Sequence, residues 1–186
     1  MCLNVLAATS DGRLLGQELK PKFNEQYEKI KEIRANRQRQ KLPENSPRLE
    51  RLEAKLSGLI KTMVGQCANQ LILAYPSCIF VVEDLDLSGC YGQKRMAYRA
   101  LHHNLERKAN CQIVNGAYTS QECPSCHYVS RKNRSGTKFR CKSCGRKSHA
   151  DVVGGINLLG RSEDKQINIE DYPSIVKRIL RERNLA

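Results

Sequence analysis

Two pairs of cysteines, each in a Cys-x-x-Cys arrangement, are the residues of this sequence best suited to chemistry. Cys123 and Cys126 form the first pair, and 14 residues separate it from the second pair, Cys141 and Cys144. Each pair offers two thiolates on one tight turn, and this spacing lets the pairs meet tetrahedrally around zinc. A site with four cysteine ligands has no open position, so the sequence predicts a structural zinc. The alternative is four reduced cysteines that bind no metal.

A lone carboxylate, Asp151, follows the last of these cysteines by seven residues and stands just ahead of a predicted helix. It is either the N-cap of that helix or a metal ligand. A second acid, Glu83, ends the apolar run 78–82, which is typical of a central strand buried on both faces. Ligand sites in open α/β sheets lie at such strand ends. The metal interpretation brings Glu83 and Asp151 together around Mg²⁺ or Mn²⁺.

The loop that joins the cysteine pairs is strongly basic. Eight Lys or Arg and no acid lie between Cys123 and His149. Cations for phosphates beside aromatic rings for bases are how proteins hold single strands. The alternative is an ordinary basic surface with Phe139 packed on a cysteine turn. The predicted nucleic-acid contacts are Tyr128, Arg131, Lys132, Arg134, Lys138, Phe139 and Arg140.

The charge of the whole chain agrees with a polyanionic partner. The formal net charge is +13 and the pI is about 9.5. Four zinc-bound thiolates lower this to about +11, which still favours nucleic acid, most simply single-stranded DNA. A generally basic protein is the alternative. Because 12 Lys or Arg face six Glu between Lys20 and Lys61, that segment is either a solvated face or an arm that contacts the nucleic-acid backbone.

The absence of targeting patterns and the cysteine count both predict a cytoplasmic protein with reduced cysteines. There is no apolar run long enough for a membrane span and no signal-peptide pattern, so we expect a cytoplasmic protein with no membrane partner. Nine cysteines, an odd number, argue against a disulfide framework. The scattered cysteines are expected in the core: Cys2, Cys67, Cys78, Cys90 and Cys111.

The elements that must position these side chains follow from hydrophobic periodicity and turn signals. The chain should open with a hairpin formed by 3–8, a turn at 10–13 and a strand from Leu14. Two helices follow as an antiparallel pair, the second capped by Ser46 with Pro47 at its first position. The later elements are strand 78–82, helix 93–109, strand 111–114, helix 152–160 and a short C-terminal helix around 175–180. This order predicts a mixed α/β layer with helices on a central sheet.

Several stretches, in this order and spacing, resemble one family: VVEDL at 81–85, TSQECPSC at 119–126, CKSCG at 141–145 and HADVVGGINLL at 149–159. They look like the C-terminal half of TnpB (OrfB-type) proteins of insertion sequences, which compact type V CRISPR effectors share. The resemblance covers nearly the whole chain. It implies a RuvC-like, Mg²⁺-dependent DNA endonuclease of RNase H fold, with a zinc ribbon that binds the target nucleic acid inserted before the last catalytic motif.

By motif, the resemblance assigns Glu83 and Asp151 as the second and third catalytic carboxylates and the four cysteines as zinc ligands. Thr119 and Ser120 match a polar pair ahead of the ribbon, and Asn157 matches the asparagine after the last acid. The implied domains are a partial RuvC-like domain at 1–117 with a helical insertion at 22–75, the ribbon at 118–150, and a last helix with a basic tail at 151–186.

Two departures from the family pattern affect the expected activity. Val153, Gly154 and Gly155 replace the usual Asn-Ala-Ala. By count, the first catalytic Asp falls ahead of Met1, as do the guide-RNA and target-recognition domains. Three other acids lie nearby, Asp11, Asp84 and Asp86, and none of them is placed to replace the absent Asp, with Asp86 the least unsuitable.

Three hypotheses result from these matches and departures. The first is a truncated TnpB-like protein that binds nucleic acid and is inactive alone, with guide RNA or self-association as further partners. The second is an active nuclease whose first Asp lies upstream or on a partner chain. The third is a zinc-ribbon nucleic-acid-binding protein that is not an enzyme.

Overall fold

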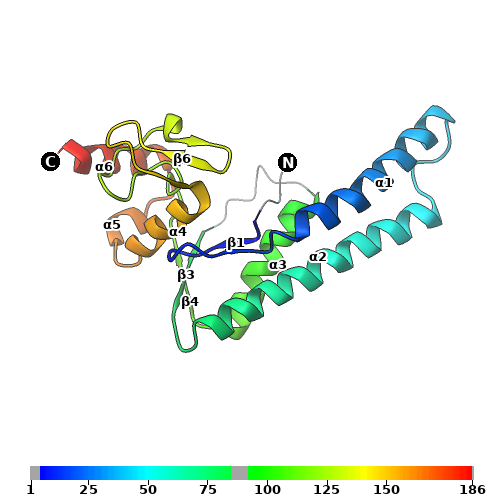
Figure 1. Cartoon of the computed structure of the whole chain (residues 1–186), viewed down its shortest axis with the longest axis horizontal. Helices are drawn as coiled ribbons and strands as arrows, with labels where there is room; N and C mark the ends of the chain where they lie inside the picture. Colours follow the sequence, from blue (N-terminus) through cyan, green and yellow to red (C-terminus); the bar gives the residue numbers. More distant parts are fainter. Residues whose placement is uncertain (1–4, 85–91, 186) are drawn as a thin grey trace. The chain divides into compact units, whose positions relative to one another are not determined.

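The protein is a mixed α/β structure, and the computed structural model describes residues 5–84 and 92–185 (Figure 1). It divides into two compact units. Unit 1 comprises Met1–Ala7, Leu15–Pro76 and Leu87–Lys108, and unit 2 comprises Ala8–Leu14, Ser77–Asp86 and Ala109–Ala186. No helix of the described chain is both long enough and apolar enough to cross a membrane. The sheet and the cysteine ribbon belong to unit 2.

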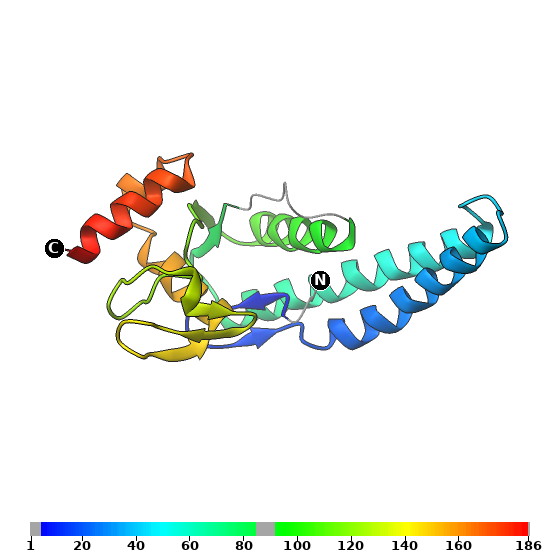
Figure 2. The same ribbon diagram turned by 90° about the horizontal axis from the view of Figure 1, so that it is seen from above.

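Unit 1 contains an antiparallel pair of long helices. Helix α1 spans Leu19–Arg39 and α2 spans Pro47–Ala74, and they run side by side in opposite directions (Figures 1 and 2). The predicted cap is confirmed, because the Ser46 hydroxyl accepts a hydrogen bond from the Leu49 amide at 3.3 Å. Helix α1 begins earlier than predicted, at Leu19. Pro21 is tolerated there because the first amides of a helix have no partner within the helix.

The apolar stripe of α2 forms the core of unit 1. It packs against α1 and against α3, Gly92–Lys108. Cys67 lies in this core as predicted, and burial followed by the nearby Glu18 raises the pKa of its thiol to about 11. Cys78 is exposed, so its prediction as a core residue was wrong. Cys2 and Cys90 lie outside the described residues. The buried apolar residues of α2 are Leu49, Leu56, Ile60, Met63, Val64, Cys67, Ala68 and Leu71.

A parallel strand pair positions one of the two candidate acids in unit 2. Strand β3 (Phe80–Glu83) pairs with β4 (Cys111–Val114), with Glu83 opposite Val114. Helix α3 lies between them in sequence, as a parallel connection requires. The prediction of a strand buried on both faces was wrong: all four β3 residues are half-buried and Ile79 just ahead of it is 65% exposed. The reason is that β4 is the only neighbour of β3 among the described strands.

The remaining elements are short. Strands β1 (Ala7–Ala8) and β2 (Leu14–Leu15) form the predicted opening hairpin, although β1 is shorter than expected. The ribbon contains the 3₁₀ turn η1 (Arg131–Asn133) and an antiparallel sheet of β5 (Arg134–Ser135), β6 (Lys138–Arg140) and β7 (Lys147–His149). Helices α4 (Ala150–Gly160), α5 (Lys165–Asn168) and α6 (Pro173–Leu185) follow. Helix α5 was not predicted, because one helical turn carries no periodicity.

The two glycines of α4 have different surroundings. A Cβ added to Gly155 would lie 3.2 Å from the Ser10 nitrogen and 3.3 Å from the Ala8 oxygen, so the hairpin backbone approaches this residue closely. A Cβ on Gly154 would meet only Thr119 and Ser120 side-chain atoms at 3.9 Å, an ordinary contact. The departure from the family pattern therefore has a packing reason at Gly155 and none at Gly154.

This difference predicts opposite effects for two alanine substitutions. Gly154→Ala should stabilise the protein by about 1 kcal/mol, because alanine is the better helix former. Gly155→Ala should destabilise it by about 1–3 kcal/mol, because the hairpin backbone must move. Urea unfolding of the two variants beside the parent chain measures both. Equal stabilisation by the two substitutions would show that the hairpin does not pack on α4.

Candidate functional site: a four-cysteine ribbon beside two carboxylates

The four cysteines of the two predicted pairs meet in one cluster. Their sulfur atoms all lie within 4.8 Å of one another. The Cys123–Cys144 and Cys126–Cys141 sulfur pairs are each 3.6 Å apart. Tetrahedral zinc with sulfur ligands at about 2.3 Å requires sulfur atoms about 3.8 Å apart, so the cluster fits a metal of this kind. In the described chain this is the only group of three or more His, Cys, Asp or Glu that could hold a metal ion.

The cluster is also the centre of a small core. Cys123 and Cys141 are buried together with Phe139, Ala150 and Val153. Phe139 is 2% exposed, so its ring is not available to a base. Its prediction as a nucleic-acid contact was wrong, and the alternative of packing on the cysteine turn describes it. Because Ala150 and Val153 belong to α4, the ribbon and the start of that helix share one core.

Asn133 connects the two cysteine turns, and sequence reasoning missed it. Its side chain is 1% exposed. The amide donates to the Gln121 and Tyr128 carbonyls at 2.9 and 3.0 Å, and its oxygen accepts from the Lys142 amide at 2.9 Å. A buried side chain with three satisfied hydrogen bonds fixes the loop around it. An asparagine in a basic loop carries no sequence signal for this role.

Four of the predicted nucleic-acid contacts remain exposed cations. Two of them lie on η1 and two on β6, and none has an acidic partner among the described residues. Tyr128, which precedes η1, is 36% exposed. Arg134 differs, because it is half-buried and donates to an Asp151 carboxylate oxygen at 2.9 Å. The exposed cations are Arg131, Lys132, Lys138 and Arg140.

Asp151 is the second residue of α4 and therefore not the N-cap. The cap is His149, whose Nδ1 accepts a hydrogen bond from the Asp151 amide at 3.2 Å. The N-cap alternative for Asp151 was wrong. A carboxylate in the first turn is favoured by the positive end of the helix dipole. Its side chain is free to bind the guanidinium of Arg134, which also donates to the Gly136 carbonyl at 3.0 Å.

Glu83 lies at the carboxyl end of β3, with its side chain packed against the backbone of Gly116. A Cβ at position 116 would overlap the Glu83 side chain, so any larger residue there would require that side chain to move. Burial raises the pKa of Glu83 to about 7. The cations Arg161 and Arg134 oppose this shift, and the negative charges of Asp84 and Asp151 add to it. The charge of Asp151 is therefore close enough to act on Glu83.

The described acids do not complete a three-carboxylate site. Asp84 is exposed, as is Asp11, which forms an ion pair with Arg13 at 3.4 Å. Neither joins Glu83 and Asp151 in a group able to hold a metal. Asp86 lies outside the described residues. That Glu83 and Asp151 hold a magnesium ion between them stays a prediction.

A buried polar network ties α4 to the segment ahead of the ribbon. Asn157 donates to the Thr119 and Glu122 carbonyls at 2.7 and 2.9 Å. Arg161 is 3% exposed. Its guanidinium donates to a Glu122 carboxylate oxygen at 3.0 Å and to the Ala117 carbonyl at 2.7 Å. The motif residues Thr119 and Asn157 thus hold the ribbon's base. Glu122 and Arg161 were missed, because neither has a partner at a recognisable spacing.

Ser120, the other half of that polar pair, is half-buried beside Gly154. A Cβ added to Gly154 would lie 3.9 Å from the Cβ of Ser120. The structure gives Ser120 a packing contact with α4, and a role in chemistry stays a prediction.

Comparison with known proteins agrees with this arrangement. The family model "Cas12f1-like, TNB domain" matches residues 95–158. Two TnpB-like proteins of Methanocaldococcus jannaschii are similar in sequence. One is 30% identical over 94 residues, which are 46% of this chain and 45% of the relative. The other is 29% identical over 121 residues, which are 61% of this chain and 29% of the relative. The chain is similar to TnpB-like proteins over part of its length.

Two solved structures are similar to this chain in fold. The mini-RNA-guided endonuclease CRISPR-Cas phi3 matches with a TM-score of 0.50 and 24% identity, over 63% of this chain and 20% of that one. CasPhi-2 (Cas12j) bound to crRNA and phosphorothioate-DNA matches with a TM-score of 0.52 and 21% identity, over 71% and 24%. The chain spans less than half the length of the curated relatives it matches.

The raised pKa of Glu83 predicts a pH-dependent stability. Its ordinary value is 4.5 and its folded value is about 7, so between these values the folded state holds the proton more tightly than the unfolded state. Stability therefore falls as pH rises through this window, by up to about 3 kcal/mol. Glu83→Gln should unfold at higher urea than the parent chain at pH 8, and the difference should shrink toward pH 5.5.

Glu44→Gln is the matched control, because Glu44 is an exposed acid in the connection between α1 and α2. It should leave stability within about 0.5 kcal/mol at both pH values. A Glu83→Gln variant that is less stable than the parent chain at pH 8 would mean that the buried carboxylate is stabilising in its charged form.

Proposed function

We propose that this TnpB-like chain binds single-stranded nucleic acid, most simply DNA, through the exposed basic face of a zinc-held ribbon. The observation that carries the proposal is the surface of the ribbon. Four exposed cations stand on it, and no acid lies between Cys123 and His149. Uncompensated cations on a rigid support attract phosphates regardless of sequence. The similar structure of CasPhi-2 (Cas12j), which is bound to crRNA and phosphorothioate-DNA, supports this partner class.

The metal of the ribbon is proposed to be zinc in a structural role. Four thiolates leave no position for water or substrate, so the ion holds the two cysteine turns together. Burial raises the pKa of the Cys123 thiol, and metal binding displaces that proton because the thiolate is the ligand.

Zinc content and ribbon order should change together. Protein purified without chelator should contain one zinc per chain. The Cys141→Ser variant should contain none, and its melting temperature should be lower by about 4–8 °C or more. Elemental analysis beside a melting curve measures both. Cys78→Ser, which changes an exposed cysteine outside the cluster, is the control and should retain the zinc. A parent chain that contains no zinc and melts at the same temperature as Cys141→Ser would contradict a structural metal.

For the whole protein, we propose a RuvC-like fold of the RNase H type and a Mg²⁺- or Mn²⁺-dependent cut of a DNA strand. Glu83 and Asp151 would hold the ion, which polarises the phosphate and activates water when bound. Arg134 contacts Asp151 now, and its guanidinium lies where a phosphate near that acid would meet it. A guide RNA is the partner proposed for such a nuclease.

The chain alone is proposed to bind without cutting. Two carboxylates are a smaller set of oxygen ligands than a two-metal site uses, and the described acids do not add a third. In addition, Glu83 carries a proton for part of the time at neutral pH because of its raised pKa. Labelled single-stranded DNA incubated with the chain and Mn²⁺ should therefore be bound, as a gel shift would show, and remain uncut. Product that disappears in Glu83→Ala would overturn this part of the proposal.

The salt dependence of binding tests the ribbon surface. If about four cations meet phosphates, the logarithm of the affinity should fall with the logarithm of salt concentration at a slope of roughly −3. Arg131→Gln with Lys132→Gln should reduce the slope to roughly −1.5. The control, Lys29→Gln with Lys31→Gln, removes two cations that already pair with Glu25 and Glu28. Binding that is insensitive to both salt and the ribbon variant would contradict the proposal.

A further inference from the structure

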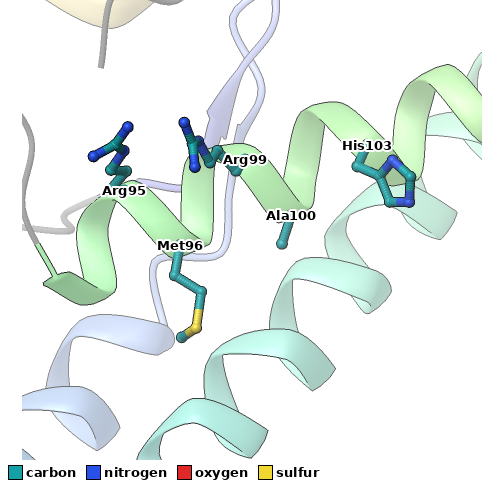
Figure 3. A pocket seen from close by; sticks show the side chains of 5 residues that line it. All are labelled: Arg95, Met96, Arg99, Ala100 and His103. Carbon is teal, nitrogen blue, oxygen red and sulfur yellow. The ribbon is translucent and has the colours of Figure 1, made fainter. Parts of the chain in front are cut away.

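Helix α3 carries a row of basic side chains that the ribbon does not explain. Arg95, Arg99 and His103 follow one another at intervals of four residues and are exposed. Each interval advances about 6 Å along a helix and keeps the side chains on one face. Figure 3 shows Arg95 and Arg99 extending to one side of the helix, while Met96 points away toward a neighbouring helix. Together with Ala100, these residues line a shallow hollow of about 490 Å³.

The two guanidinium groups of this row are uncompensated. Within the described residues, neither Arg95 nor Arg99 has a hydrogen-bond or ion-pair partner. Other arginines with an acid in reach are paired, such as Arg183 with Asp164. The sequence of α3 contains a single acid, Glu106, which lies at the C-terminal end of this face. Two exposed guanidinium groups with no counter-ion among the described residues make a site for an anion that repeats along a chain.

We infer that the α3 row, Arg95, Arg99 and His103, is a second nucleic-acid contact that binds the phosphate backbone. The guanidinium fork matches the geometry of a phosphate and binds it through two hydrogen bonds. Two guanidinium groups about one helical turn apart suit a polymer with one charge per unit better than an acidic protein, whose charges are irregular. The row belongs to unit 1 and the ribbon to unit 2, so this contact extends the proposed function without resting on the ribbon.

Binding of a labelled 40-nucleotide strand, as DNA and as RNA of the same sequence, tests the row in the intact chain. Arg95→Gln with Arg99→Gln should reduce the magnitude of the salt slope by roughly 1.4, because two phosphate contacts are lost. The effect should be equal for DNA and RNA, since phosphates are common to both. Arginine and glutamine have similar helix propensities, so the melting temperature should not change.

Two further variants sharpen the test. Arg95→Lys with Arg99→Lys keeps the charge and loses the fork, so the slope should persist while the affinity falls several-fold. Arg178→Gln with Arg181→Gln removes two exposed cations from α6 and is the control for net charge alone.

The inference is overturned if the glutamine pair on α3 changes the slope no more than the α6 control does. It is also overturned if the pair weakens binding of poly-glutamate and leaves the nucleic acid unaffected, which would assign the row to an acidic protein. Loss through α3 with no loss through the ribbon variant would contradict the proposed ribbon function and leave this inference standing.

Discussion

The four-cysteine cluster is the constraint on which the rest of unit 2 depends. Its sulfur atoms lie within 4.8 Å of one another, and two of the cysteines share a buried core with Phe139, Ala150 and Val153. The last two residues begin α4, the helix that carries Asp151. A metal ion that closes the cluster therefore orders the basic loop and also fixes where one of the two candidate acids starts. The surface proposed to bind nucleic acid and the carboxylate proposed to hold a metal ion therefore share one support.

Buried polar contacts extend that support to the other acid. Asn157 and Arg161 bind carbonyls between β4 and the ribbon, and Arg161 also binds the Glu122 carboxylate at 3.0 Å. The same segment contains Gly116, against which Glu83 packs. Within unit 2, the electrostatics are balanced by cations from two elements, because Arg134 and Arg161 both oppose the raised pKa of Glu83. An arriving phosphate or metal ion would change this balance directly.

The sequence predicted what periodicity and spacing encode, and it failed where tertiary contacts decide. The cysteine pairs, the cap at Ser46 and the strand at 111–114 could be predicted, because each has a local pattern. The fate of Phe139 could not, since an aromatic among cations is compatible with both a base contact and a core. The Arg134–Asp151 pair was also invisible, because the partners are 17 positions apart with strands β6 and β7 between them, and only the folded ribbon joins them. Glu83 could be placed at a strand end, but its burial against Gly116 follows from a close backbone approach.

Hydrogen exchange with and without a strong zinc chelator tests most directly whether the metal cluster organises the site. We predict that chelation speeds exchange of the amides at 119–149 and at the first turn of α4, because their shared core loses its centre. Amides in the middle of α2, which belong to unit 1, should remain protected. Unchanged protection of the ribbon after the metal is removed would contradict the account, as would an equal loss of protection in α2.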